Sequence, residues 1–267
     1  MKLAFIGGGA MGEAMIRGVL AKGSVAPSDI RVCDIDASRL ETLRQIYNID
    51  TRDDYASAME GADVIVLAVK PQALPGLMPE IKDRLADSQL VLSIIVGAGI
   101  DTIVKGLGHT RIVRAMPNTP AQIGAGITAW IASTDVTPDQ MEAARGILEA
   151  LGREIFVPDE EYIDMATAVS GSGPAYVFYM IEGLIEAATR IGLPGDIAGE
   201  LALETVLGAA RLARQTGQGP EELRIMVTSP GGTTAAGLEQ LEKGNFIELI
   251  SRAVAAAHKR AKELGDG

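Results

Sequence analysis

The sequence predicts an α/β protein in which a doubly wound, mostly parallel sheet is followed by an all-helical domain. Three observations carry this prediction. A glycine-rich turn follows a short apolar segment at the start of the chain. Apolar segments and helical patterns then alternate through the first half, which indicates parallel strands with helices on both faces of a sheet. From about residue 159 onward, only helical patterns remain.

The first strand is predicted at Lys2–Ile6, and it leads directly into Gly7-Gly8-Gly9-Ala10-Met11-Gly12. This turn matches G-x-G-x-x-G, the dinucleotide-binding motif of Rossmann domains. The first glycine permits the tight turn, the second leaves room for a pyrophosphate, and the third lets the next helix pack closely. Met11–Leu20 has the amphipathic pattern of that helix. The alternative is a glycine-rich strand-to-helix turn that binds nothing.

An acidic residue stands where this motif requires one. A second β-like segment, Ile30–Cys33, ends at Asp34, about twenty residues beyond the last glycine, where an acid meets the ribose hydroxyls of NAD. Arg39 follows one helical turn later and is able to attract the 2′-phosphate of NADP instead. NADPH and NADH therefore both remain open as cofactors.

Further strands are predicted at Val64–Val69, Leu90–Val96, Ile112–Ala115, Ile127–Ile131 and Glu154–Val157, with helical patterns such as Pro138–Leu151 between them. Ligands bind such sheets at the carboxyl ends of the strands. At that edge we expect cofactor contacts from Gly7, Gly8, Gly9, Ala10, Met11, Gly12, Asp34, Val69, Lys70, Pro71, Val96 and Asn118. Lys70 follows a strand and is fixed by Pro71, so we interpret it as a donor beside the cofactor. A strand-end lysine that reaches solvent is the alternative.

The second half of the chain is predicted to be helical at Pro174–Ile191, Ile197–Gln215, Thr234–Lys243 and Phe246–Leu264. Several of these helices are apolar around most of their circumference and must be buried on all sides. A small helical domain has too little interior for them, so a partner subunit is expected to cover them. We therefore predict a dinucleotide-binding domain at 1–158 and a dimerisation and substrate-binding domain at 159–267.

The most informative segment is Val227–Gln240, VTSPGGTTAAGLEQ. Hydroxyl side chains surround a Pro-Gly-Gly turn, and a helical pattern follows. The glycines let a ligand approach the backbone, and the free N–H groups at the helix start attract an anion such as a carboxylate. The alternative is a helix that is simply capped by Ser or Thr.

Composition excludes several classes of protein. The net charge of −11 argues against a nucleic-acid or anionic-membrane partner. The single cysteine, Cys33, excludes a disulfide framework, and the two histidines lack metal-ligand spacing, so no metal is expected. The long uncharged stretches are interrupted by Pro, Gly and Asn and do not span a membrane. The glycine turn explains the apolar start better than a signal peptide does. We expect a cytoplasmic enzyme.

Five segments together resemble the pyrroline-5-carboxylate reductase family, and the resemblance covers nearly the whole chain. They are IGGGAMGEAM at 6–15, VIVLAVKPQ at 64–72, RIVRAMPNTP at 111–120, SGSGPAYVF at 170–178 and VTSPGGTTAAGLEQ at 227–240. The resemblance implies a Rossmann domain, a helical dimerisation domain, and reduction of L-Δ1-pyrroline-5-carboxylate to L-proline with NADPH or NADH. It also implies a homodimer that often assembles into a larger ring such as a decamer.

The resemblance further implies that the substrate is held by Glu160, Ser229, Gly232, Thr233 and Thr234, with Thr234 nearest the reacting nitrogen. One departure is Tyr55, a position at which many relatives carry Asn, and this leaves the cofactor contact there open.

An independent chemical argument points the same way. Oxidation of an alcohol needs a base, commonly His or Lys, and this chain has no plausible catalytic histidine. A protonated cyclic imine is already an electrophile and needs mainly a well-placed hydride donor. Two alternatives stay open: a reductase related to the β-hydroxyacid dehydrogenases, and a dinucleotide sensor without catalytic activity.

Overall fold

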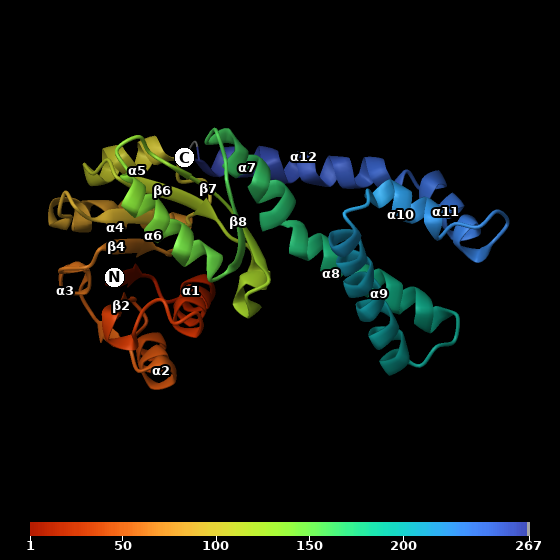
Figure 1. The fold of residues 1–267 in the computed structure, drawn as a ribbon, viewed down its shortest axis with the longest axis horizontal. Coiled ribbons are helices and arrows are strands. Elements are labelled where there is room, and N and C mark those ends of the chain that lie inside the picture. The colour runs from red at the N-terminus through yellow and green to blue at the C-terminus, as the bar shows by residue number, and fades with distance from the viewer. Residues whose placement is uncertain (266–267) are drawn as a thin grey trace. The chain divides into compact units, whose positions relative to one another are not determined.

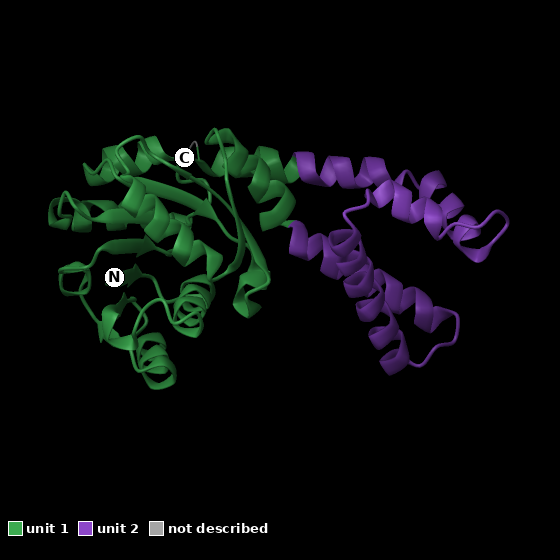
Figure 2. Ribbon diagram, in the orientation of Figure 1, with its two compact units in different colours: residues 1–172, 256–267 green, residues 173–255 purple. Residues whose placement is uncertain are grey.

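The computed structural model describes residues 1–265 and has two compact units (Figures 1 and 2). Unit 1 comprises Met1–Ser172 together with the chain from Ala256 on, and unit 2 comprises Gly173–Ala255. The last strand ends at Phe156. The change from strands to helices therefore falls where the sequence predicts it, whereas the first compact unit continues to Ser172.

Unit 1 is built on one eight-stranded sheet in the order β3-β2-β1-β4-β5-β6-β7-β8 (Figure 1). The strands are β1 Leu3–Ile6, β2 Ile30–Cys33, β3 Asp50–Arg52, β4 Val64–Leu67, β5 Leu90–Ser93, β6 Ile112–Met116, β7 Gly126–Ala132 and β8 Gly152–Phe156. All neighbours are parallel except β6 and β7. The winding reverses at β1, which lies between β2 and β4, and ligands of open α/β sheets bind at such a switch point.

The period-two alternation of the strands separates two hydrophobic clusters. In β1, Leu3 and Phe5 belong to one cluster, whereas Ala4 and Ile6 belong to the other, and all four are buried. Residues of three helices, α1 (Ala10–Ala21), α2 (Ala37–Tyr47) and α6 (Pro138–Glu149), complete the first cluster. Residues of α3 (Tyr55–Met59), α4 (Leu74–Ile81) and α5 (Ile100–Leu107) complete the second. Burial of a side chain as large as Phe5 contributes about 1.5–3 kcal/mol. The sheet is therefore doubly wound, as predicted.

The helices of unit 1 are α1 Ala10–Ala21, α2 Ala37–Tyr47, α3 Tyr55–Met59, α4 Leu74–Ile81, α5 Ile100–Leu107, α6 Pro138–Glu149 and α7 Glu161–Ala166. Short 3₁₀ segments occupy Pro27–Asp29, Pro71–Ala73, Lys82–Arg84 and Thr119–Ile123. Helix α6 begins with a capping box between Thr137 and Gln140, which satisfies two backbone N–H groups. A π-helical turn, Thr167–Gly171, follows α7 and covers the first residues of the SGSG segment.

Unit 2 is entirely helical. It contains α8 Gly173–Arg190, α9 Gly195–Thr216, α10 Pro220–Met226 and α11 Thr233–Lys243, and α12, Phe246–Gly265, begins in it and ends in unit 1. The described residues after Phe156 contain no strand, as the sequence predicts. Helix α10 was not predicted, because its seven residues are too few to show a clear apolar period.

The long helices of unit 2 leave much of their apolar surface exposed in the single chain. In α9 only Ala198 and Ala202 are buried, whereas Leu201 and Leu203 are 52% and 50% exposed. Large exposed hydrophobic side chains also line α8 and α12, among them Val177, Phe178, Met180, Leu184, Ile247 and Leu249. An isolated protomer therefore does not provide the burial that the sequence pattern demands.

Candidate functional site

The glycine turn at the end of β1 has the geometry that its motif requires. Gly7 has φ +104°, and a Cβ atom there would lie 2.6 Å from the carbonyl oxygen of Ala68. A Cβ on Gly12 would lie 2.6 Å from the carbonyl oxygen of Gly7, whereas a Cβ on Gly9 would meet nothing within 4 Å. Gly7 and Gly12 are therefore fixed by close backbone approach, and Gly9 faces open space of the kind that a pyrophosphate needs.

The amino end of α1 is ready to accept an anion. Its N-cap is Gly9, which has no side chain to accept a hydrogen bond. Within α1, the first N–H group that donates to a backbone carbonyl is that of Glu13, which donates to Gly9. The preceding N–H groups of Ala10, Met11 and Gly12 make no hydrogen bond within the described chain. Unpaired N–H groups at a helix start bind phosphate oxygens.

Asp34 lies at the end of β2, beside the glycine turn. Its carboxylate accepts hydrogen bonds from the backbone N–H groups of Gly8, at 2.6 Å, and Asp36, at 3.0 Å. The side chain of Arg39 turns toward the same loop, where Nε donates to the Gly8 carbonyl oxygen and Nη2 pairs with Glu13. Asp34 and Arg39 are therefore both held against the glycine turn.

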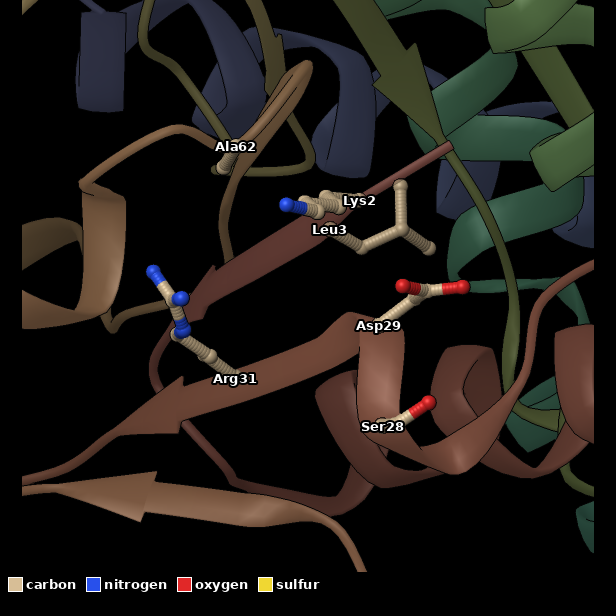
Figure 3. Close-up of a pocket in the computed structure, with 6 residues that line it drawn as sticks. All are labelled: Lys2, Leu3, Ser28, Asp29, Arg31 and Ala62. Carbon is tan, nitrogen blue, oxygen red and sulfur yellow. The ribbon is translucent and has the colours of Figure 1, made fainter.

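A cavity of about 370 Å³ opens at the carboxyl ends of β2 and β3. It is lined by Cys33, Asp34, Ile35, Asp53, Asp54, Tyr55, Glu80 and Arg84. Burial, followed by the charges of Asp54, Asp34 and Asp53, raises the pKa of the Cys33 thiol to about 11. A second cavity, of about 80 Å³, lies at the opposite, amino end of β1 and β2, away from the glycine turn (Figure 3).

The remaining predicted cofactor residues of the adjacent strands follow β4 and β5. Lys70 is exposed, and its ammonium group makes no hydrogen bond or ion pair within the described chain. Its carbonyl oxygen accepts from Ala73 in the short helix that Pro71 begins. Val69 and Val96 are half-buried. The carboxyl edge of the sheet thus gathers the predicted residues of β1, β2, β4 and β5 in one unit.

Asn118 lies after β6 and is buried. Its Oδ1 accepts from the N–H group of Ile127, and its Nδ2 donates to the carbonyl oxygen of Ser170 at 3.1 Å. The amide therefore fixes the π-helical turn of the SGSG segment to the sheet. Both of its polar atoms are used in this way, so the structure gives Asn118 a clear positioning function.

Glu160 belongs to a charge cluster around the buried Arg114, which the sequence did not reveal. Its Oε1 accepts from Nη1 of Arg114, at 2.9 Å, and from the N–H group of Ile100, at 2.7 Å. Nη2 of Arg114 pairs with Asp164 at 2.6 Å, and the Arg114 side chain is 5% exposed. The only signal for Arg114 was a charged residue inside an apolar strand. Its partners are 46 and 50 residues away in the chain.

The signature loop lies between α10 and α11 in unit 2. Ser229 to Gly232 forms a turn in which the N–H group of Gly232 donates to the Ser229 carbonyl oxygen at 3.0 Å. Gly231 has φ +71°, and a Cβ on Gly232 would lie 2.4 Å from Oγ of Ser229. Both glycines are therefore required, the first by conformation and the second by space.

Helix α11 begins without a side-chain cap, since its N-cap is Gly232. The first N–H group paired in this turn is that of Ala236, so the three preceding N–H groups make no hydrogen bond within the described chain. Thr233 and Thr234 are exposed, and their hydroxyl groups also lack a partner there. Neither threonine acts as the cap of this helix. Ser229, Gly232, Thr233 and Thr234 lie together in unit 2, whereas Glu160 belongs to unit 1.

These features define a dinucleotide-binding oxidoreductase fold with a separate helical unit. A family model described as pyrroline-5-carboxylate reductase dimerisation matches residues 160–264, and one described as NADP oxidoreductase coenzyme F420-dependent matches residues 2–97. A pyrroline-5-carboxylate reductase of Synechocystis sp. is 43% identical over 265 residues, which cover 99% of this chain and 98% of that protein.

Solved structures agree with this similarity. A pyrroline-5-carboxylate reductase of Coxiella burnetii has a TM-score of 0.91 and 43% identity, and 98% of each chain is covered. The Plasmodium falciparum pyrroline carboxylate reductase with NADP bound has a TM-score of 0.90 and 30% identity, covering 99% of this chain and 98% of its own. The chain belongs to the pyrroline-5-carboxylate reductase family.

Proposed function

We propose that the chain reduces L-Δ1-pyrroline-5-carboxylate to L-proline, with NADPH or NADH as the hydride donor. The observation that carries the proposal is similarity to named pyrroline-5-carboxylate reductases over 99% of the chain, at 43% identity. Family membership favours this reaction over that of a hydroxyacid dehydrogenase and over a sensor without catalytic activity. We assign the dinucleotide site to residues 1–158 and substrate binding and dimerisation to residues 159–267, an assignment supported by the family model at 160–264.

The residues at the carboxyl edge of the sheet fit a dinucleotide. The free N–H groups at the start of α1 suit its pyrophosphate, and the open side of Gly9 leaves the space. The carboxylate of Asp34 is suited to accept hydrogen bonds from the hydroxyls of a ribose. Contacts from the loops after β4, β5 and β6 are assigned to Val69, Lys70, Pro71, Val96 and Asn118. When bound, the reduced nicotinamide supplies the hydride.

The signature loop fits the substrate carboxylate. Three unpaired N–H groups and the hydroxyls of Ser229 and Thr233 form an anion-binding site at the start of α11. Glu160 is assigned to the same substrate. Since its Oε1 already accepts from Arg114 and Ile100, its Oε2 is the atom left to accept a further hydrogen bond.

The reaction requires little of the protein beyond placing the hydride donor against the carbon of the C=N bond. The carbon of the protonated C=N bond accepts a hydride, and the π electrons of that bond become the lone pair of the amine nitrogen. Thr234 has a free hydroxyl with which to hold that nitrogen as its charge changes. No strong base is needed, in agreement with the absence of a histidine near these residues in the sequence.

We also propose that the chain functions as a homodimer, whose dimers assemble into a larger ring such as a decamer. The exposed apolar side chains of α8, α9 and α12 and the dimerisation family model support the dimer.

A cytoplasmic location and the absence of a nucleic-acid partner are supported by the single cysteine and the net charge of −11. No helix within residues 1–265 is long and apolar enough to cross a membrane, and these residues contain no metal-binding group of three acidic, His or Cys side chains.

The reaction is tested by following oxidation of NADH and NADPH with freshly prepared imine and, separately, with a panel of 3-hydroxy acids in the reverse direction. We expect oxidation of the reduced dinucleotide only when the imine is present, with proline as the product. Turnover of a hydroxy acid without turnover of the imine would contradict the proposal. Dinucleotide binding without any turnover would favour the sensor.

A further inference from the structure

The loop that joins β5 to α5, residues 94–99, lies at the carboxyl edge of the sheet and carries Val96, a predicted cofactor residue. In the strand order β1-β4-β5, only the loop after β4 separates it from the glycine turn. The backbone N–H groups of Val96 and Gly97 make no hydrogen bond within the described chain, although Gly97 is buried and Val96 is half-buried. Unpaired N–H groups at this edge are donors that a bound ligand is able to use.

Glu160 fixes the end of this loop. The N-cap of α5 is Gly99, which has no side chain to accept a hydrogen bond. Oε1 of Glu160 takes that place and accepts from the N–H group of Ile100, the first residue of α5, at 2.7 Å. A carboxylate at the start of a helix is also favoured by the helix dipole. The two residues are 60 apart in the chain, so this cap is a tertiary contact.

Arg114 holds the Glu160 carboxylate in place. Its Nη1 donates to Oε1 of Glu160 at 2.9 Å, and its Nη2 pairs with Asp164 at 2.6 Å. Of these two carboxylates, only that of Glu160 also accepts from α5 among the hydrogen bonds of residues 1–265. Loss of either acid therefore breaks one ion pair of Arg114, but only loss of Glu160 frees the start of α5.

The middle of the loop is confined by the end of α12. A Cβ atom on Gly97 would lie 2.7 Å from both the carbonyl carbon and the carbonyl oxygen of Leu264. The loop is therefore held by backbone packing at Gly97 and by the Glu160 hydrogen bond at Ile100. The second of these restraints depends on a single side chain.

We propose that Glu160, anchored by Arg114, is a positioning residue for dinucleotide binding. Its hydrogen bond to Ile100 keeps the loop in the conformation that presents the N–H groups of Val96 and Gly97 to the dinucleotide. The proposal rests on the proposed function for the presence of a dinucleotide, and this role of Glu160 requires no contact with the imine. Without the hydrogen bond the loop has more conformations to lose on binding, so the dinucleotide binds more weakly.

NADH and NADPH should be affected alike by this positioning. Asp34, which is suited to the ribose that carries the additional phosphate of NADPH, follows β2. Strands β2 and β5 lie on opposite sides of β1 in the sheet. A change at the β5–α5 loop therefore acts on a part of the dinucleotide that the two cofactors share.

The proposal is tested by isothermal titration calorimetry of the whole protein with NADH and with NADPH, in the absence of imine. Glu160→Ala should raise both dissociation constants about five- to tenfold, the effect expected for loss of one helix cap. Glu160→Gln keeps an oxygen that accepts from Ile100 and should recover most of the affinity. The matched control is Asp164→Ala, which removes the other partner of Arg114 and leaves the cap. It should lower the melting temperature, as Glu160→Ala does, and leave both dissociation constants nearly unchanged.

A second variant, Ile100→Pro, removes the donor instead of the acceptor. Pro is well tolerated at the first position of a helix, and Gly99 already has the extended backbone that precedes a proline, with φ −67° and ψ 155°. The ion pairs of Arg114 stay intact. Both dissociation constants should rise as in Glu160→Ala, so this variant decides the question even if Glu160→Ala does not fold.

Unchanged dissociation constants in folded Glu160→Ala or Ile100→Pro would overturn the proposal, and a raised KM for the imine alone would then favour the substrate role of Glu160. An equal rise in Asp164→Ala would also overturn it, because the effect would then come from the charge cluster and not from the loop. Dinucleotide binding that depends on Glu160, without any turnover of the imine, would support this proposal and refute the proposed reaction. If the unaltered protein bound neither cofactor, both would fail.

Discussion

The two units of this chain differ in how far their apolar side chains are buried and their polar groups are paired within the single chain. In unit 1 the strands alternate between two buried clusters, and buried Arg114 has two carboxylate partners within the same unit. In unit 2 helix α9 buries only Ala198 and Ala202, and the hydroxyls of Thr233 and Thr234 have no partner in the described chain. Unit 1 accounts for its own stability. Unit 2 needs a second surface and a ligand.

The largest effect that would break or support this comparison is expected from a charge in α9. Leu203→Glu would bury an unpaired carboxylate if a second protomer covers the helix, which costs several kcal/mol, of the order of 3–5. Sedimentation should show dissociation at micromolar concentration. In unit 1, Ile46→Glu makes the same change at a side chain that is 60% exposed, and assembly should not change. A fully active monomer of the unaltered protein would contradict the comparison.

Loss of the buried cation of unit 1 should have a comparable effect on stability. Arg114→Met leaves Glu160 and Asp164 without their partner, and breaking a buried ion pair costs about 3–5 kcal/mol. Urea unfolding should show this loss, whereas Arg111→Met, at a half-buried arginine just before β6, should cost far less. Equal losses would mean that the cluster is not a special source of stability.

A smaller effect separates folding from binding within the glycine turn. Gly7→Ala places a Cβ against the Ala68 carbonyl at positive φ and should cost about 1–3 kcal/mol. Gly9→Ala meets open space. It should leave the melting temperature nearly unchanged and weaken dinucleotide binding. If Gly9→Ala lowered the melting temperature as much as Gly7→Ala, Gly9 would have no distinct role toward a ligand.

The smallest effect concerns pH and the Glu13 contacts. Burial acts to raise the pKa of Glu13, but the hydrogen bonds from Arg39 and Tyr47 outweigh it and hold the pKa below 4.5. A carboxyl group with a lowered pKa stabilises the fold above its ordinary pKa, and the stabilisation is lost as the pH falls below that value. Tyr47→Phe should therefore cost about 0.5–1.5 kcal/mol at pH 7 and less below pH 4. Urea unfolding at the two pH values measures the difference, and an unchanged cost would refute the assignment.

The sequence predicts what depends on short-range pattern. The glycine turn, the apolar strands and the long helices all carry such a pattern, and the fold class is confirmed. Strand β3 was not predicted, because its three residues, Asp50–Arg52, are polar and lie at the edge of the sheet. The Arg114 cluster was not predicted either, since its contacts join distant parts of the chain.

The assigned roles of the site residues follow from motif resemblance and remain predictions. The structure adds the reason why the motif has its composition. Gly231 needs positive φ, Gly232 has no room for a Cβ beside Ser229, and α11 has no side-chain cap. No pattern of residue types alone distinguishes such an anion-binding loop from an ordinary capped helix.

The central claim is that the signature loop of unit 2 carries out imine reduction, and kcat/KM of Thr234→Ala with the imine tests it most directly. Loss of one hydrogen-bond donor to the changing charge should lower kcat/KM by roughly ten- to a thousandfold. Thr234→Ser keeps the hydroxyl and should recover much of the activity. Melting temperatures of the same preparations should change little, because Thr234 does not cap α11. Unchanged turnover in Thr234→Ala together with a lower melting temperature would contradict the account.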